Sequence, residues 1–309
     1  MRFGLLGTGW WADHVHAAAL ASHPVVEFVG VWGRDAAKAA AVAGRHSTIA
    51  EPDLDALLGK VDAVTVAVPP DVQAELACRA AAAGCHLLLE KPLALSPAAA
   101  GRVVVATERA GVASLVAGWG FTRGEPVASW YRDVVAPGRW HGGSAYAAAN
   151  LFQAGNPFGS SPWRAQHGAL WDAGAHAVDA LLPALGPVEE VAAERGPGDT
   201  VQLLLRHAPG GVSSATVSLT APQEASGMHV ELWGQEGIVR SPQPDHGRAP
   251  DAMAQMSRQA IDDLVSASES RGPHERDVHF GDAVVRVLAA AERFLERPAE
   301  RRGERPLPP

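Results

Sequence analysis

The sequence predicts an α/β fold of two domains: a doubly wound parallel sheet comes first, and an α+β domain on a largely antiparallel, open sheet follows. Three observations lead to this fold class. The chain has 309 residues, which is more than one hydrophobic core usually supports. Up to about residue 117, short apolar runs alternate with Ala-rich stretches of helical length. Beyond Gly118, apolar runs joined by turn residues replace that alternation, as in antiparallel sheets.

The first domain is predicted to cover residues 1–118. Its apolar runs lack the strict alternation of half-exposed strands, and continuous apolar strands between helices are typical of parallel pairing with both sheet faces covered. Gly84 and Gly111 follow helical stretches, as left-handed C-caps do, while Ser96-Pro97 has the form of an N-cap and a first-turn proline. The predicted strands are residues 3–6, 25–32, 63–68, 86–89 and 114–117.

The second domain is predicted to cover residues 119–279. A last Ala- and Val-rich helix over about 280–296 is expected to pack back on the first domain and complete it. The charged, Pro-rich tail at 298–309 is expected to be flexible. Within the second domain, helices are predicted near 127–135 and 170–185, and strands near 144–150, 201–207, 212–219 and 229–233.

The composition excludes several classes of protein. A hydrophobic fraction of 47% against 19% charged residues predicts a folded chain rather than a disordered one. The net charge is −8 and the basic residues are scattered except in the last ten positions, which argues against a nucleic-acid partner. No apolar stretch has the length of a signal-peptide core or a membrane span, so a cytoplasmic protein without membrane contact is expected. Cys78 and Cys85 are expected to be small buried side chains, and no metal site is predicted.

A glycine-rich turn follows directly after the first strand. It reads Gly7-Thr8-Gly9-Trp10-Trp11-Ala12, a GxGxxA form of the dinucleotide-binding fingerprint. Gly7 permits the tight turn, Gly9 lets the backbone approach a pyrophosphate, and Ala12 is small enough for close packing of helix on strand. The N-terminus of the following helix would face the phosphates. Because the turn lies between a strand and a helix, it predicts a Rossmann-type domain whose loop residues bind a nicotinamide dinucleotide.

The end of the second strand bears on the choice between NAD and NADP. Folds that prefer NAD usually place Asp or Glu there for the ribose 2′-hydroxyl, but this strand ends in Gly33 and Arg34, with the acid displaced to Asp35. Gly33 makes room, and the Arg34 guanidinium could hold a 2′-phosphate and stack on adenine, which slightly favours NADP. The alternative is that Asp35 caps the next helix and Arg34 is only solvated.

Two further strands end in short motifs at the carboxyl edge of the predicted sheet, where ligands of open parallel sheets bind. One strand ends at Val68-Pro69-Pro70 and the next in Glu90-Lys91-Pro92, and both motifs are predicted to border the cofactor. Lys91 could stabilise negative charge on a substrate oxygen as hydride moves. Taken alone, Lys91 could equally be a surface lysine paired with Glu90.

An acid–histidine pair occurs in the second domain. Asp172 and His176 are four residues apart and Asp179 follows His176 by three, which places all three on one face of a helix. An imidazole oriented by a carboxylate is a proton donor or acceptor near neutral pH, and Gly174 leaves space for a ligand. The alternative is an N-capping Asp beside a structural His.

Five motifs occur in a fixed order along the chain, namely GTGWWA, VAVPP, AGCHLLLEKPLA, SPWR and DAGAHAVD. With this order and spacing, the chain resembles the Gfo/Idh/MocA family of NAD(P)-dependent sugar and cyclitol oxidoreductases. The resemblance implies that Lys91, Asp172 and His176 are catalytic and line the nicotinamide and substrate pocket. It also implies NADP or NAD as cofactor, a carbohydrate or cyclitol substrate, and a homodimer or homotetramer that assembles through the second domain.

The chain departs from the family pattern beside this pocket. Gln73 stands where the family often has His after PPxx, the Gly-rich step before the Asp–His motif is reduced to His167-Gly168, and the aromatic–Arg stretch becomes residues 121–125. These departures put substrate identity, more than chemistry, in doubt. Because sugars pack their C–H faces on indole rings, Trp171 is considered together with the expected substrate contacts, although such tryptophans could instead fill the core or a subunit interface. The expected contacts are Trp119, Arg123, Trp163, Arg164, Asp172 and His176.

The expected reaction is reversible oxidation of a secondary alcohol. His176 takes the hydroxyl proton, Lys91 polarises the oxygen, and Asp172 orients the imidazole. Two other functions of the same fold stay open at this point. One is a glycoside hydrolase that oxidises and then re-reduces a retained cofactor while eliminating a glycoside. The other is a non-catalytic regulator that keeps the cofactor site and binds a protein partner.

Overall fold

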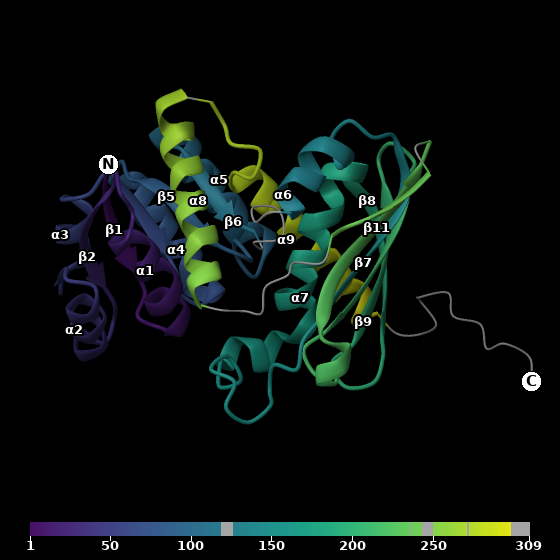
Figure 1. Cartoon of the computed structure of the whole chain (residues 1–309), viewed down its shortest axis with the longest axis horizontal. Helices are drawn as coiled ribbons and strands as arrows, with labels where there is room; N and C mark the ends of the chain where they lie inside the picture. The colour runs from purple at the N-terminus through teal and green to yellow at the C-terminus, as the bar shows by residue number, and fades with distance from the viewer. Residues whose placement is uncertain (119–125, 236, 243–249, 271, 298–309) are drawn as a thin grey trace, which may run out of the picture. The chain divides into compact units, whose positions relative to one another are not determined.

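The chain forms two compact units in the computed structural model (Figure 1). Unit 1 consists of Met1–Ala128 and Pro244–Val285, and unit 2 of Ser129–Gln243 and Arg286–Pro309. The chain therefore begins unit 1, builds most of unit 2, and then returns to unit 1. The residues that the structure describes are 1–118, 126–235, 237–242, 250–270 and 272–297. The predicted flexible tail, 298–309, lies outside the described residues.

Within its described residues, unit 1 is built on a six-stranded sheet of order β3-β2-β1-β4-β5-β6, and all strand pairs in it are parallel. The order reverses direction between β1 and β4, which is where doubly wound sheets open a crevice for ligands. This confirms the predicted fold class. The short β3 was not predicted because two residues make no recognisable apolar run. The strands are β1 (Arg2–Leu6), β2 (Glu27–Trp32), β3 (Ile49–Ala50), β4 (Ala63–Val66), β5 (His86–Glu90) and β6 (Ser114–Ala117).

The helices of unit 1 begin and end largely where the capping residues predict. Ser96 Oγ accepts a hydrogen bond of 3.2 Å from the Ala99 N–H, with Pro97 in the first turn. Gly84 and Gly111 both have left-handed φ values, 83° and 65°. The helices are η1 (Ala12–Ala17, π-helical), α1 (Ala18–Ala21), α2 (Ala36–Arg45), α3 (Leu54–Leu58), α4 (Pro70–Ala82), α5 (Pro97–Ala110) and α8 (Pro250–Ser270).

Helix α8 was not predicted, and it covers part of the unit 1 sheet. Its buried side chains Ala260, Ile261 and Leu264 belong to the same hydrophobic core as Phe3 and Leu5 of β1. Figure 1 shows α8 as the yellow-green helix beside β5. The predicted end of the second domain at residue 279 therefore differs from the structure, which packs Pro244–Val285 with unit 1.

Helix α9 (Val278–Leu295) begins in unit 1, to which its residues up to Val285 belong. Its first turn is joined to β6, because the Val278 N–H donates to Ser114 Oγ over 3.2 Å. Gly281 lets the helix approach closely: a Cβ there would lie 2.8 Å from Val116 Cγ2. The remainder of α9 belongs to unit 2.

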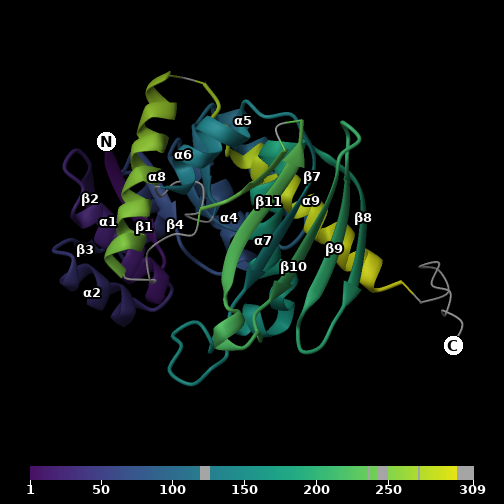
Figure 2. The ribbon, with the colours of Figure 1, turned by 45° about the vertical axis from the view of Figure 1, so that its right-hand side comes forward.

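Unit 2 is built on a sheet of order β12-β11-β7-β10-β9-β8 within its described residues (Figure 2). Only the β7–β10 pair is parallel among these strand pairs, so the prediction of a largely antiparallel sheet is confirmed. The edge strands β8 and β12 were not predicted, because β8 is rich in charged residues and β12 is short. The strands are β7 (Trp140–Ala148), β8 (Val188–Arg195), β9 (Val201–His207), β10 (Val212–Ser218), β11 (Gly227–Gly234) and β12 (Gly237–Arg240).

The two faces of the unit 2 sheet differ. Helix α7 (Pro162–Leu185) packs on one face against β7 and β10, and alternate residues of β9, such as Leu203 and Leu205, are buried. The opposite face carries exposed apolar side chains, which are 42% to 64% exposed: Leu204, Val212, Trp233 and Ile238. The remaining helical segments are α6 (Val127–Trp130), η3 (Tyr131–Val135) and η4 (Gln223–Ala225).

Two of the predictions from composition can be compared with the structure. Cys85 is buried, and burial raises the pKa of its thiol to about 11, as expected for an inert side chain. Cys78 is only half-buried, so the prediction of two buried cysteines was wrong for this one, which lies on α4. In the part of the chain that the structure describes, no helix has the length and hydropathy required to cross a lipid bilayer.

Candidate functional site

The glycine turn after β1 has the geometry of a dinucleotide-binding loop. Gly7 has a φ of 137°, and a Cβ there would lie 2.3 Å from the Ala67 carbonyl oxygen, so only glycine fits. The Gly7 N–H donates to the Trp32 carbonyl over 2.9 Å, which fixes the turn to β2. At Gly9 a Cβ would meet no described heavy atom within 4 Å, and Ala12 is fully buried under the turn. The loop therefore offers open backbone at Gly9 before a helix start, which fits a pyrophosphate.

The end of β2 supports this loop. A Cβ on Gly33 would lie 2.5 Å from Thr8 Cγ2, so the absence of a side chain at Gly33 lets the loop pass close by. Asp35 Oδ1 accepts from the Lys38 N–H over 3.1 Å, which shows that Asp35 caps α2. Arg34 is exposed and has no hydrogen-bonding partner among the described residues. The Asp35 carboxylate is thus occupied as a helix cap and is not available to a ribose hydroxyl. The Arg34 guanidinium beside it is accessible.

The two tryptophans of the loop face different neighbours. Trp10 stacks on His14, with ring centroids 4.6 Å apart and an interplanar angle of 7°. Trp11 donates its indole N–H to Glu90 Oε1 over 2.8 Å. The dinucleotide loop is therefore hydrogen-bonded to the end of β5, directly beside Lys91.

The Glu90 carboxylate is the centre of a hydrogen-bonded group in unit 1. Its Oε1 atom also accepts from His16 Nε2 over 2.7 Å, and Nδ1 of that buried ring lies 3.2 Å from Ser257 Oγ on α8. Burial by itself raises the pKa of Glu90, but the hydrogen bonds from His16 and Trp11, together with the charge of Lys91, hold this pKa below its ordinary value. Glu90 is therefore an ionised carboxylate on a side chain that is only 17% exposed, which differs from the surface pair considered for Glu90 and Lys91.

Gln73 on α4 fixes the backbone on both sides of Lys91. Its Oε1 atom accepts from the Glu90 N–H over 3.0 Å. Its Nε2 atom donates to the carbonyl oxygens of Glu90, Pro92 and Leu93 over 2.5, 3.1 and 3.3 Å. The Gln73 side chain is fully buried. The glutamine that departs from the family pattern therefore stabilises the backbone of the turn around Lys91.

The other predicted strand end differs slightly from its prediction. Strand β4 ends at Val66, two residues before Val68. Pro69 is the N-cap of α4 and Pro70 its first residue, a position at which proline needs no hydrogen-bond donor. The prolines therefore end the strand early and start the helix, at the carboxyl edge of the sheet as expected.

The acid–histidine group lies on α7 in unit 2. Asp172 and Asp179 are buried and His176 is partly exposed. Asp172 Oδ2 accepts from Arg164 Nε over 2.7 Å. The Arg164 guanidinium lies over the rings of Trp163 and Phe158, 4.7 and 5.4 Å from their centroids. Arg164 is thus held by aromatic contacts while it neutralises Asp172.

The predicted substrate contacts fall into three groups. Trp163 and Arg164 are partly exposed near Asp172. Trp171 is buried and donates its indole N–H to Glu292 Oε1 over 2.8 Å, so it is a core residue as the alternative supposed. Trp119 and Arg123 lie outside the described residues.

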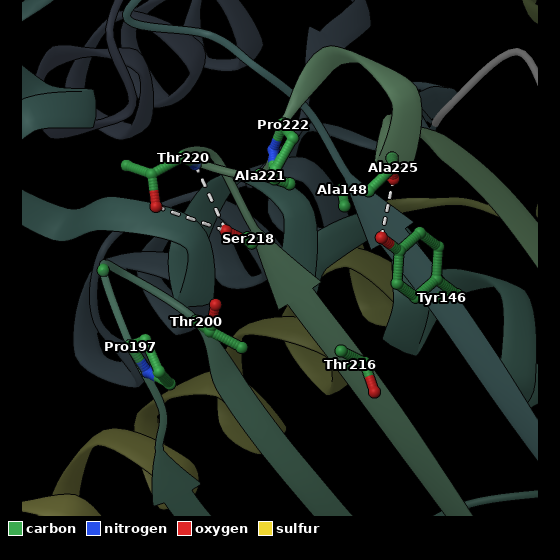
Figure 3. Close-up of a pocket in the computed structure, with 11 residues that line it drawn as sticks. Tyr146, Ala148, Pro197, Thr200, Thr216, Ser218, Thr220, Ala221, Pro222 and Ala225 are labelled. Carbon is green, nitrogen blue, oxygen red and sulfur yellow. Dashed lines mark hydrogen bonds between the residues drawn. The ribbon is translucent and has the colours of Figure 1, made fainter.

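A cavity of about 330 Å³ opens on unit 2 away from these residues (Figure 3). Five of its eleven described lining residues carry hydroxyls, among them Thr200, Thr216 and Ser218. Tyr146 donates its hydroxyl to the Ala225 carbonyl over 2.6 Å. None of the described residues that line it is a predicted site residue. Among the described side chains, no group of three or more His, Cys, Asp or Glu residues is placed to hold a metal ion.

Comparison with protein families gives one assignment for both units. A profile of an oxidoreductase family with an NAD-binding Rossmann fold matches residues 1–118. The profile of the GFO/IDH/MocA C-terminal domain matches residues 142–240. The two matches lie in the order predicted from the motifs and together include most of the chain.

Individual relatives match over different lengths. UDP-N-acetylglucosamine 3-dehydrogenase of Acidithiobacillus ferrooxidans is 38% identical over 95 residues, which are 31% of this chain and 29% of that protein. The rhizopine catabolism protein MocA of Rhizobium meliloti is 27% identical over 314 residues, which cover 96% and 95% of the two chains. The first curated relatives are therefore matched over less than a third of their length.

A solved structure of levoglucosan dehydrogenase in complex with NADH has a TM-score of 0.81 to this chain. The two sequences are 19% identical, and the superposition covers 95% of this chain and 96% of that one. This likeness shows the fold.

Proposed function

Because the chain belongs to the Gfo/Idh/MocA oxidoreductase family, we propose that it transfers a hydride between NAD(P) and a secondary alcohol or ketone of a sugar or cyclitol. The observation that carries the proposal is the turn from Gly7 to Ala12, whose geometry fits a dinucleotide pyrophosphate, together with Lys91, which follows β5 at the same edge of the sheet. The 3-dehydrogenase among the relatives acts on a nucleotide-linked sugar according to its name, which supports a carbohydrate hydroxyl as the reacting group.

In this proposal the residues divide the chemistry between them. When bound, the nicotinamide supplies or accepts the hydride. His176 removes the proton of the substrate hydroxyl in the oxidative direction and returns it in the reductive one. Lys91 stabilises the negative charge that develops on the reacting oxygen. Asp172 orients the imidazole, and Arg164 supports the charge of Asp172 through their hydrogen bond.

The reaction is tested by a screen of sugars and cyclitols, in which nicotinamide absorbance is followed with both cofactors. A net absorbance change that depends on substrate supports the dehydrogenase. Release of an aglycone without net change in absorbance would indicate the glycoside hydrolase instead. Cofactor binding without turnover of any substrate would indicate the non-catalytic regulator.

We propose NADP as the preferred cofactor, because Arg34 is accessible beside the loop and Asp35 is engaged as a helix cap. Arg34→Ala is expected to weaken NADP binding by roughly 1 to 3 kcal/mol, the range of a charged hydrogen bond, and to leave NAD binding nearly unchanged. Calorimetric titration of the wild type and the variant with both cofactors measures the difference. Equal weakening for NADP and NAD would contradict a 2′-phosphate contact at Arg34.

We also propose that the exposed face of the unit 2 sheet joins two copies of the chain. Trp233 pairs with Ile238 on one side and with Gly142 on the other, and Val212 pairs with Gly142, so the register sets these apolar residues in one row. Exposed apolar rows of this kind mark association surfaces.

Trp233→Glu is expected to weaken self-association by about 2 kcal/mol or more, since it places a charge in a desolvated interface. Light scattering after size-exclusion chromatography at several concentrations measures the change. Thr48→Ala, in unit 1, is the control. A wild-type chain that is monomeric at all concentrations would contradict the interface.

A further inference from the structure

The carboxylate of Glu90, the residue that precedes Lys91, accepts three hydrogen bonds from donors in the described part of the chain. The Glu90 carboxylate accepts from the Trp11 indole N–H at 2.8 Å and from His16 Nε2 at 2.7 Å. Its second oxygen, Oε2, accepts from the backbone N–H of Lys91 at 3.3 Å. One carboxylate thus receives donors from the dinucleotide loop, from the first helical segment and from the peptide group of Lys91.

The donor arrangement at His16 follows from the chemistry of its partners. An ionised carboxylate only accepts hydrogen bonds, so His16 Nε2 carries the hydrogen that points at Glu90. Its other ring nitrogen, Nδ1, lies 3.2 Å from the Ser257 hydroxyl on α8, so both nitrogens are hydrogen-bonded. His16 is buried, so its ring has one orientation in which both partners are satisfied.

The backbone around Lys91 is held from the opposite side by Gln73. This side chain accepts a hydrogen bond from the Glu90 N–H and donates hydrogen bonds to the carbonyl oxygens of Glu90 and Pro92. Lys91 therefore stands between two residues whose peptide groups are fixed. The Trp11 indole brings the GxGxxA turn, whose backbone at Gly9 is open to a ligand, into contact with Glu90.

We propose that Glu90 is a positioning residue that couples the dinucleotide loop to Lys91 through the Trp11 indole, so that a cofactor bound at the loop orders the Lys91 turn. The inference rests on the proposed function only in requiring that the loop binds a nicotinamide dinucleotide. The Glu90 side chain is only 17% exposed, and a largely desolvated carboxylate depends strongly on each of its donors, because water replaces a lost donor poorly. Ordering of the loop is therefore transmitted to the peptide group of Lys91.

Trp11→Phe tests the coupling, since it keeps an aromatic ring and removes the indole N–H. Hydrogen exchange of the segment 86–94 is measured by mass spectrometry with and without saturating NADP or NAD, and cofactor binding is measured by calorimetry. In the wild type, the cofactor is expected to slow exchange in this segment roughly fivefold or more. In Trp11→Phe the cofactor still binds and still protects the segment 4–13, while its effect on 86–94 falls below about twofold.

Two further variants keep the test decisive. Glu90→Gln retains the size of the side chain and one acceptor but loses the charge. It is expected to give the same loss of protection, and it replaces Trp11→Phe as the test if that variant does not fold. Asp55→Asn alters an exposed carboxylate of the same unit, paired with Arg79 over 2.8 Å, and is expected to behave as wild type.

The possible outcomes separate this inference from the function on which it rests. Full cofactor-dependent protection of 86–94 in a folded Trp11→Phe or Glu90→Gln variant would overturn the coupling. Protection of the loop alone in the wild type would also overturn it, although the cofactor site would stand. Failure of the wild type to bind either dinucleotide would overturn the proposed function, and the coupling with it.

Discussion

His176→Asn is expected to lower kcat by about 10² to 10⁴, with thermal stability and cofactor affinity close to those of the wild type. The reason is that an amide transfers no proton at neutral pH, although it keeps much of the size and polarity of the ring. The neighbours Ala175 and Ala177 are buried, whereas His176 is partly exposed. Loss of the ring therefore leaves little unfilled space in the core. Turnover and melting temperature are measured on the same sample.

His207 provides a matched histidine whose role is structural. It is fully buried on β9, where its ring nitrogens lie 2.7 Å from the Gly186 carbonyl oxygen and 2.8 Å from Ser213 Oγ. Burial lowers the pKa of His207, as expected for a neutral core imidazole. His207→Asn is expected to destabilise the fold by about 1 to 3 kcal/mol and to leave turnover per folded molecule unchanged. If His176→Asn showed this second pattern, His176 would be removed from the mechanism.

Lys91→Ala is expected to reduce kcat/KM by about 10² to 10³, because the variant loses the positive charge that stabilises the reacting oxygen. Exchange protection of the segment 86–94 should persist, since the contacts of Glu90 and Gln73 do not require the lysine side chain. Steady-state kinetics with the substrate found in the screen, together with calorimetric cofactor titration, measure the effect.

The chain offers close controls for Lys91, since it has only two other lysines, Lys38 and Lys60. Both are exposed and both form ion pairs, with Asp35 and Glu51 respectively. Lys38→Ala and Lys60→Ala are expected to keep kcat/KM within about twofold of the wild type, because exposed ion pairs contribute little. Activity of Lys91→Ala within the same twofold range would contradict a role in charge stabilisation.

The fold of unit 1 was predictable where local signals were strong. Continuous apolar strands, the glycine turn and the caps at Ser96 and Gly111 all act within a few residues, and the structure has them where the sequence places them. Helix α8 was missed although Ala260, Ile261 and Leu264 recur at helical spacing. Its sequence indicates an amphipathic helix, but only the folded structure shows that this helix covers the sheet of unit 1.

The candidate site divides in the same way. The turn at Gly7 and Gly9 is recognisable because its constraints are those of the backbone, and those constraints are local. The hydrogen bonds around Glu90 could not be predicted, because they join residues far apart in the sequence. His16, which contacts Glu90, is itself hydrogen-bonded to Ser257, 241 positions further along the chain. The pairing of Asp172 with Arg164, eight residues earlier, was also missed, since helical spacing placed Asp172 on one face with His176 and Asp179.

The interrupted path of unit 1 has a consequence for how the protein is made. Phe3 and Leu5 pack in one core with Ile261 and Leu264, so the apolar surface of the first strand is not fully covered until the ribosome has released most of the chain. At about 5–20 residues per second, the nascent sheet waits many seconds for α8. The strands of unit 2, from β7 to β12, are complete earlier, at Arg240. Unit 2 also waits for the end of the chain, because it includes Arg286–Pro309 as well as these strands. Neither unit is therefore complete before the C-terminal helices are synthesised, and closing the long loop that brings α8 back to β1 is expected to be a slow step of folding.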